Sequence, residues 1–277
     1  MTRLLARPLP WAAALLMTLA GCQTGGTISI SPPPELADAP RWNVAGRQGW
    51  LSQRKLRFGD FRTTDVESST QKQRTEQCPN GCWNVELSRL YASQFDQAFH
   101  TAKQRLTFRQ VDAHGGSAAV RAYADSRVEQ TEWRTRWFGV TVDSGHIKSR
   151  QQTIYGTIAP AAEGASPWRF WLGESSGLVQ TALGNAQDDE GHHLEIRPWN
   201  EVPDSMMPAV RLAGGSGAVP GYALVMDGRH VAAVDTFVGG HVWIDPQLPP
   251  DRQLVIASLC SMLLLRAQFA PSPGASF

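Results

Sequence analysis

Apolar and polar side chains alternate with a period of two along much of the chain, which predicts mainly β-strands. The alternation is partial in residues 42–50 and 55–68, where Gly49 and Gly59 predict bulges or close approaches of the backbone. The polar stretch 69–77 interrupts the pattern, so the strand is expected to end before it.

A hairpin is predicted where two strand patterns flank a turn. Residues 105–112 and 118–129 form the strands, and His114-Gly115-Gly116 forms the turn. Further strands are expected at residues 147–161 and 168–173.

One internal segment carries a helical pattern instead. Between Leu87 and Lys103 the apolar side chains recur every three or four positions, at Leu87, Leu90, Tyr91, Phe95 and Phe99. This spacing predicts an amphipathic helix that packs against a sheet.

The C-terminal part predicts a three-stranded meander. Strands at 222–226 and 230–238 are joined by the turn dipeptide Asp227-Gly228, and a third strand follows at 241–244. The whole pattern predicts an α+β fold, a mainly antiparallel β-sheet with two or three helices, in which one helix is buried at the C-terminal end.

That helix is opened by Pro249-Pro250-Asp251 and is apolar nearly all round between Leu254 and Leu265. About a dozen apolar residues are too few to cross a bilayer, so we expect this helix to lie under the sheet. Asp251 and Arg266 are placed to offset the two ends of its dipole.

The N-terminus has the pattern of an export signal. Arg3 and Arg7 form a basic start, an apolar run extends to Leu19, and small residues follow at Ala20 and Gly21. Leu19-Ala20-Gly21-Cys22 resembles the lipobox of bacterial lipoprotein precursors. The resemblance covers the signal alone, and no family is recognised in the rest of the chain.

The resemblance implies that residues 1–21 are removed and that Cys22 receives diacylglycerol and a further acyl chain such as palmitate. Two or more acyl chains form a durable membrane anchor. Gln23, rather than Asp, follows the cysteine, which in that class implies sorting to the outer membrane, facing the periplasm. The alternative is a cleaved signal followed by an unmodified cysteine.

Composition fits a globular body on a tether. Residues 22–40 are rich in Gly, Ser and Pro and predict a flexible tether, residues 41–269 a single domain, and residues 270–277 a loose tail. Removing Arg3 and Arg7 leaves 24 basic against 25 acidic side chains, a net charge of −1. This near-neutral net charge does not indicate the basic surface that nucleic-acid binding needs.

The cysteines divide by context. Cys78 and Cys82 flank Pro-Asn-Gly, a turn sequence, and an oxidising periplasm favours a small disulfide loop between them. A redox-active pair or a metal clip is the alternative, although the spacing differs from the thioredoxin-like one. Cys260 then remains alone in an apolar stretch.

An aromatic and basic stripe is a candidate binding surface. On a strand, Trp133 and Trp137 share one face, while Arg134 and Arg136 share the other. Such a stripe suits a glycan or an anionic lipid. The alternative is that one face of this strand packs in the core and the other faces solvent.

A candidate nucleophile lies in Gly173-Glu174-Ser175-Ser176-Gly177, which matches the G-x-S-x-G elbow, with residues 178–183 as the start of its helix. Ser175 would need a base and an acid, for which His230 or His241 with Asp227 or Asp235 are available. A glycine-rich chain produces this motif by chance, and the parallel sheet that supports an elbow is not evident. We therefore favour a plain Gly-Ser loop.

Two further stretches carry residue types used in ligand sites. Residues 188–193 (Asp-Asp-Glu-Gly-His-His) contain metal-binding types, but their spacing favours a solvated acidic loop before a strand. Residues 214–217 with Gly221 miss the G-x-G-x-x-G spacing by one residue and predict a loop. No metal and no cofactor are expected.

The leading hypothesis is a non-enzymatic binding or assembly lipoprotein of the cell envelope, anchored in the outer membrane through Cys22. Its partner would be an envelope protein, a lipid or a glycan held on a face of the sheet. The alternative is a periplasmic serine hydrolase with Ser175 as nucleophile.

Overall fold

The fold was analysed in a computed structural model, which describes residues 29–46, 55–77, 93–137, 140–176, 181–201, 219–237 and 239–266. Within these ranges the chain forms twelve β-strands, one α-helix and a short 3-10 turn at Pro34–Leu36. The strands are β1 (Arg41–Asn43), β2 (Arg57–Phe58), β3 (Phe61–Gln77), β4 (Ser93–Val111), β5 (Ser117–Trp137), β6 (Val140–Pro160), β7 (Trp168–Ser176), β8 (Thr181–Gln187), β9 (His193–Pro198), β10 (Gly221–Met226), β11 (Arg229–Asp235) and β12 (His241–Ile244), and the helix is α3 (Pro250–Leu265).

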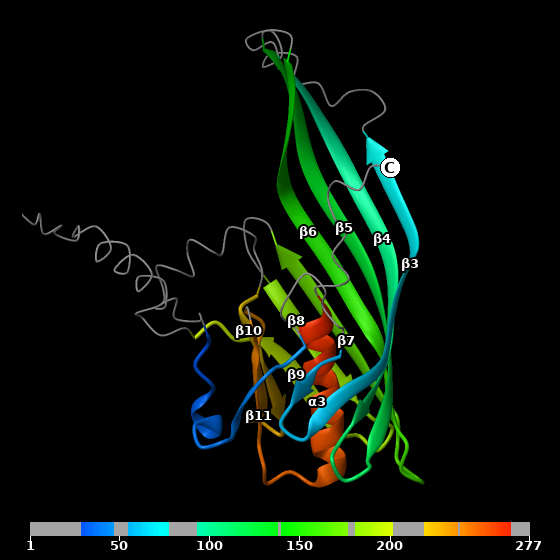
Figure 1. The fold of residues 1–277 in the computed structure, drawn as a ribbon, viewed down its shortest axis with the longest axis vertical. Helices are drawn as coiled ribbons and strands as arrows, with labels where there is room; N and C mark the ends of the chain where they lie inside the picture. Colours follow the sequence, from blue (N-terminus) through cyan, green and yellow to red (C-terminus); the bar gives the residue numbers. More distant parts are fainter. Residues whose placement is uncertain are drawn as a thin grey trace, which may run out of the picture.

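All twelve strands belong to one antiparallel sheet. Its order is β1-β12-β11-β10-β9-β8-β7-β6-β5-β4-β3-β2, so apart from β1 every strand lies beside its neighbour in sequence. The two ends of the sheet meet where Ala45, just after β1, pairs with Arg57 of β2 through N···O contacts of 2.9 and 3.1 Å. The sheet therefore curls fully round at this level (Figure 1).

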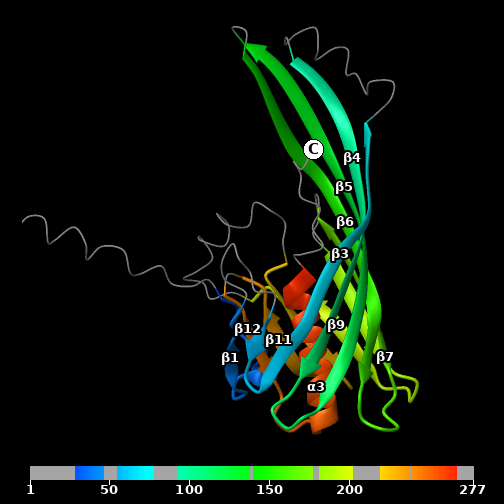
Figure 2. The ribbon, with the colours of Figure 1, turned by 45° about the vertical axis from the view of Figure 1, so that its right-hand side comes forward.

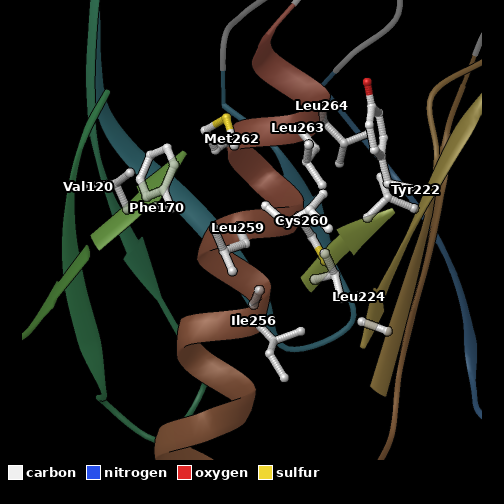
Figure 3. Packing of buried hydrophobic residues seen from close by; sticks show 14 of the residues in the cluster. Val120, Phe170, Tyr222, Leu224, Ile256, Leu259, Cys260, Met262, Leu263 and Leu264 are labelled. Carbon is white, nitrogen blue, oxygen red and sulfur yellow. The ribbon is translucent and has the colours of Figure 1, made fainter. Parts of the chain in front are cut away.

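Helix α3 stands inside the curl and forms the centre of the core. It contacts β3, β4, β5 and β6 on one side and β11 and β12 on the other. Figure 3 shows Val120 and Phe170 facing the helix from one wall, and Tyr222 and Leu224 from the other. All residues from Leu254 to Leu265 are buried, as the all-round apolar pattern predicts. No helix in the described part of the chain has the length and apolar character needed to cross a membrane.

Four strands extend well beyond the helix. Strands β5 and β6 have 21 residues each and β4 has 19, so each reaches roughly 65–70 Å. Their far halves form a four-stranded ladder, β3-β4-β5-β6, that projects from the body (Figure 2).

Residues 29–40 pack against the outer face of the body. Ile30 and Leu36 are buried in a small cluster with Ala233 and Trp243. The Ser31 amide donates to the Glu201 carbonyl at 2.8 Å, and the Trp199 indole donates to the Ser31 carbonyl at 2.7 Å. We call residues 29–40 the N-terminal strap. It occupies part of the segment that the sequence assigns to the tether.

The predicted fold class, with two or three helices, is wrong, because the described residues contain a single α-helix. The expected helix at residues 87–103 falls on strand β4 from Ser93 onward, and residues 87–92 lie outside the described residues. A spacing of four, as between Phe95 and Phe99, also keeps side chains on one face of a strand. Pairing with β3 on one side and β5 on the other decides in favour of the strand.

Residues 69–77 also differ from the prediction, because they continue β3 instead of ending it. Their polar character fits a strand outside the core, where no face needs to be apolar. Gly59 lies in the turn between β2 and β3 with a φ of 51°, so residues 55–68 form a hairpin rather than one bulged strand.

Other predicted elements are confirmed. The hairpin of residues 105–112 and 118–129 is the base of β4 and β5. The meander is β10, β11 and β12, and Asp227 and Gly228 turn between its first two strands with φ values of 51° and 76°. Helix α3 is the predicted buried C-terminal helix.

We expect substitution of Leu259 to test the central place of α3. Leu259 is fully buried, so Leu259→Ala should lower the free energy of unfolding by about 2–5 kcal/mol, and Leu259→Asp should prevent folding. Thermal and denaturant unfolding measure the first, and soluble yield with circular dichroism the second. Leu183→Ala, at a side chain 60% exposed, is the control. A stable, soluble Leu259→Asp variant would contradict the assignment.

Candidate functional site

The convex face of the sheet carries a row of three aromatic side chains, of which two are exposed and Tyr123 is half-buried. Tyr123 of β5, Tyr155 of β6 and Trp171 of β7 lie directly opposite one another on adjacent strands. Tyr155 is 44% and Trp171 43% exposed, and Leu183 of β8 lies beside them at 60%. Tyr155, Trp171 and Leu183 are the exposed large hydrophobic residues of the described part of the chain. We call Tyr123, Tyr155, Trp171 and Leu183 together the aromatic face.

Strand alternation explains why this face is exposed. On β6, Ile154 and Ile158 are buried against the core while Tyr155 points away, and on β7, Phe170 and Leu172 are buried while Trp171 points away. The aromatic face is therefore on the opposite side of the sheet from α3, and the fold does not need it for its core.

The rings are arranged to leave a broad surface. Tyr123 and Tyr155 have ring centroids 5.8 Å apart with planes inclined by 22°. The Trp171 ring lies over Gly173, where an added Cβ would come within 3.4 Å of the indole. That distance is an ordinary van der Waals contact, so the indole lies beside the strand over Gly173.

Basic side chains border the aromatic face. Arg105 lies opposite Tyr123, and Arg121 and Arg169 occupy the next row of the same face. Arg169 is paired with Asp189, whereas Arg105 and Arg121 are exposed and have no ion-pair partner among the described residues. The face is therefore amphipathic and cationic at its border.

The predicted stripe at Trp133, Arg134, Arg136 and Trp137 lies elsewhere, at the far end of the ladder. Its backbone partners on β6 are Ser144 for Trp133 and Val140 for Trp137. The structure describes the backbone at these positions, and the stripe as a binding surface stays a prediction.

Ser175 lies on β7, where it pairs with Gln151 of β6 and Thr181 of β8. The helix expected at residues 178–183 is absent from Thr181 onward, because β8 begins there. The order of the sheet places β7 four strands from β11, about 19 Å away, so Ser175 is not brought to His230 or Asp235.

His241 and Asp235 do come together, but as part of a structural cluster. Asp235 is fully buried, and its Oδ2 lies 3.0 Å from His241 Nδ1. The hydroxyl of Ser29 lies 3.3 Å from that same Nδ1, while the Arg41 guanidinium approaches His241 Nε2 at 2.9 Å. In a catalytic triad the serine hydroxyl and the acid contact different ring nitrogens of the histidine, whereas here both lie at Nδ1. This cluster instead joins the N-terminal strap to β11 and β12.

His230 has a similar role. Its Nδ1 lies 3.0 Å from Glu35 Oε2, and Glu35 belongs to the strap. The hydrogen bond with His230 is the main reason why the pKa of Glu35 lies below its usual value. Asp227 sits in the β10–β11 turn. Both histidines available to a hydrolase therefore hold the strap.

A cavity of about 570 Å³ opens at the base of the molecule, where α3 begins. The β4–β5 turn, the loop after β6 and the start of α3 line it, and Trp168, Asp188 and Arg252 contribute side chains. Arg252 lies over the Trp168 ring, 5.2 Å from its centroid, and 3.2 Å from Asp188 Oδ2.

Asp188 is the centre of this network. Its carboxylate accepts hydrogen bonds from the His192 backbone amide at 2.9 Å and from Arg252, and it lies 2.8 Å from the His192 ring. Burial opposes ionisation, but these hydrogen bonds outweigh it and lower the pKa of Asp188. The carboxylate joins the β8–β9 turn to the start of α3.

Asp188, Glu190 and His192 offer ligand atoms within 4.8 Å of one another, a spacing that a metal ion can use. Arg252 already places its guanidinium against Asp188 and within 2.9 Å of His192 Nδ1. A cation would have to displace this side chain, so the arrangement is explained by the Arg252 ion pair.

The cysteines offer no reactive group in the described part of the chain. Burial raises the pKa of the Cys260 thiol far above its usual range, so it stays protonated within the core. Cys22, Cys78 and Cys82 lie outside the described residues.

Sequence reasoning missed the aromatic face, although a signal was present. In Trp168-Arg169-Phe170-Trp171-Leu172 the period-two pattern puts Trp171 on the side of Arg169, away from the three apolar positions. What the sequence does not contain is the register that brings Tyr123, Tyr155 and Trp171 into one row.

We expect Asp188→Asn to destabilise the fold in a pH-dependent way. A folded pKa below the unfolded value contributes stability above pH 4, which is lost as the pH falls through the folded pKa. Unfolding at pH 7 should show a loss of about 1–3 kcal/mol, and the difference from wild type should shrink below about pH 4. The control is Glu163→Gln on the exposed loop after β6. A deficit that is the same at pH 3 and pH 7 would exclude this explanation.

Comparisons with known proteins give no family for the chain. No family model matches it, and neither a curated protein nor a solved structure matches it either. Its function is therefore inferred from the sequence and from the side chains described above.

Proposed function

We propose that this protein is a non-enzymatic lipoprotein, anchored in the outer membrane through Cys22, whose aromatic face binds a glycan of the cell envelope. The observation that carries the proposal is the row of Tyr123, Tyr155 and Trp171, the last two of them exposed, on a face that the core does not use. The lipobox-like Leu19 to Cys22 supports the anchor and the periplasmic side of the outer membrane.

The geometry favours a glycan over the other classes of partner. Adjacent strands are about 4.8 Å apart, close to the length of one sugar ring, so a row of aromatic side chains across three strands matches the spacing of successive sugars. Arg105, Arg121, Asn185 and Thr157 surround the row with hydrogen-bonding groups, which a sugar needs for its hydroxyls. The unpaired arginines favour a glycan with acidic groups.

The position of the strap supports a partner away from the anchoring membrane. The strap lies beside β11 and β12, whereas β5, β6 and β7 lie across α3 from it (Figures 1 and 2). Seven peptide links separate Cys22 from Ser29, a reach of at most about 25 Å. The aromatic face is then turned away from the point of attachment and toward the periplasm.

We expect Trp171→Ala and Tyr155→Ala each to weaken binding to an acidic envelope glycan about tenfold, which corresponds to about 1.4 kcal/mol, because each removes one stacking ring. Co-sedimentation with purified peptidoglycan and titration with its soluble fragments measure the affinity. Trp171→Phe keeps a ring and should lose less, and unfolding curves should match wild type because both side chains lie outside the core. Equal binding by wild type and Trp171→Ala, or binding to lipid vesicles alone, would refute the glycan assignment.

We expect Cys22 to carry the anchor. Cells fed labelled palmitate should label the wild-type protein, and Cys22→Ala should abolish the label. A second variant carries a cleavable export signal without a lipobox in front of the mature chain. This protein should fold, and it should no longer be found in the membrane fraction. Sedimentation of that chain with outer membrane in high salt would show that something other than acyl chains holds the protein.

A further inference from the structure

The ladder has two free backbone edges in the described part of the chain. Strand β3 pairs with β2 at Arg62 and Phe61 alone, so beyond Thr63 its outer side has no described partner strand. Strand β6 pairs with β7 from Arg150 to Ile158, so residues 140–149 have a described partner, β5, on one side only. Among the described strands, the curl that closes the base thus leaves both sides of the ladder without a neighbour (Figure 2).

Free edges of this length attract a partner, because each exposes a row of unpaired N–H and C=O groups. Soluble proteins usually interrupt such edges with bulges. Strand β3 has bulges between Thr64 and Glu67 and between Thr70 and Lys72, but Lys72–Gln77 is regular. On β6 the register shifts opposite Glu129 and Gln130, and residues 140–147 beyond it are regular. Each edge therefore keeps an uninterrupted stretch.

The two stretches are complementary in direction. Strand β3 runs from the base toward the tip of the ladder, and β6 runs from the tip back toward the base, because the four strands alternate. A β3 edge placed beside the β6 edge of another copy would continue the same antiparallel order. No rearrangement of either copy is required.

Pairing of the two stretches requires neighbouring copies to be shifted along the strands. Through the ladder register, Gln77 of β3 is level with Ile147 of β6, so the free part of β6 begins where that of β3 ends. Sheets that curve round an axis have strands tilted by about 35–45°, which shifts register by roughly five residues over the width of four strands. The proposed pairing needs a shift of that size toward the tip, which would set Lys72–Gln77 against residues 142–147.

We propose that copies of this chain assemble head to tail, the β3 edge of one copy pairing with the β6 edge of the next to form one continuous antiparallel sheet. The interface is heterologous, so repetition produces a ring where the rotation between copies closes, and all copies point the same way. If β6 instead paired antiparallel with β6 of another copy, the two copies would point in opposite directions, with the tip of one ladder beside the base of the other molecule. The inference concerns self-association and is independent of what the aromatic face binds.

The first test is the mass of the full processed protein, purified from membranes in mild detergent. Native mass spectrometry and negative-stain electron microscopy should show a ring of more than two copies. A monomer at micromolar concentration, or a dimer that does not grow, would overturn the proposal.

Proline substitutions identify the edge. Along β6 successive N–H groups point alternately to β5 and to the free side. Of the two variants Thr141→Pro and Val142→Pro, one therefore removes an N–H that faces the free side, and the other removes an N–H that bonds to β5. The free-side variant should unfold like wild type, yet elute as one copy, whereas its neighbour should lose ladder stability. If both proline variants fold and both still assemble, the proposal is overturned.

Amide hydrogen exchange gives a readout without mutation. In the assembled protein, the outward-facing amides of residues 72–77 and 140–147, which are every second one, should exchange at least about tenfold more slowly than in the same protein diluted until it dissociates, because they gain partners. The central strand β5 at residues 121–128, paired on both sides in either state, is the internal control. An assembled protein in which both edges exchange as fast as in the monomer would show that copies meet elsewhere.

Discussion

The burial of α3 on every side is the constraint on which the rest of this structure depends. A helix with one apolar stripe can rest on an open sheet, but the residues from Leu254 to Leu265 are all buried and need contacts all round. A single sheet meets this need only by curling until its two ends meet, which it does at Ala45 and Arg57. Twelve strands in simple sequential order supply the circumference, and β1 joins β12 to complete it.

The same constraint explains where the closed part of the sheet ends. Facing the helix, the inner positions of the sheet are apolar, as at Leu106, Val120 and Ile154. Where α3 ends, Arg266 binds Glu174 at 3.0 Å, the Leu263 carbonyl at 3.0 Å and the Val219 carbonyl at 3.3 Å, and its guanidinium lies over the Tyr222 ring. Beyond this cluster the described residues include no further apolar helix for the sheet to cover. Strands β3 to β6 continue there as an open ladder, so its free edges follow directly from the length of the helix.

Much of the base was predictable from sequence, and the ladder was not. Local signals sufficed for α3 and for the β10–β12 meander, because an all-round apolar run and an Asp-Gly turn each have one common structural solution. Residues 69–77 and 93–103 are mainly polar, so period-two alternation fades there and the spacing of four between Phe95 and Phe99 imitates a helix. Registers between strands set both the aromatic face and the free edges, and such long-range pairing leaves no local trace. The candidate catalytic residues show a related limit. The sequence offers His241 and Asp235 as a possible base and acid, but residue type alone does not show that Ser29 and Arg41 surround them.

The strap connects these features to the proposed anchor. Ser29 and Arg41 bind the buried His241 and Asp235 pair, Glu35 binds His230, and Ile30 and Leu36 are buried, so the chain is firmly attached to the body from its first described residue. With Cys22 acylated as proposed, only the short stretch between Cys22 and Ser29 separates the body from the lipid. Neighbouring copies on one membrane would then stand at nearly the same height and in the same orientation. Head-to-tail pairing of the β3 and β6 edges requires that common orientation, so a short anchor and a clamped strap would reduce the orientational cost of assembly on a membrane relative to free solution.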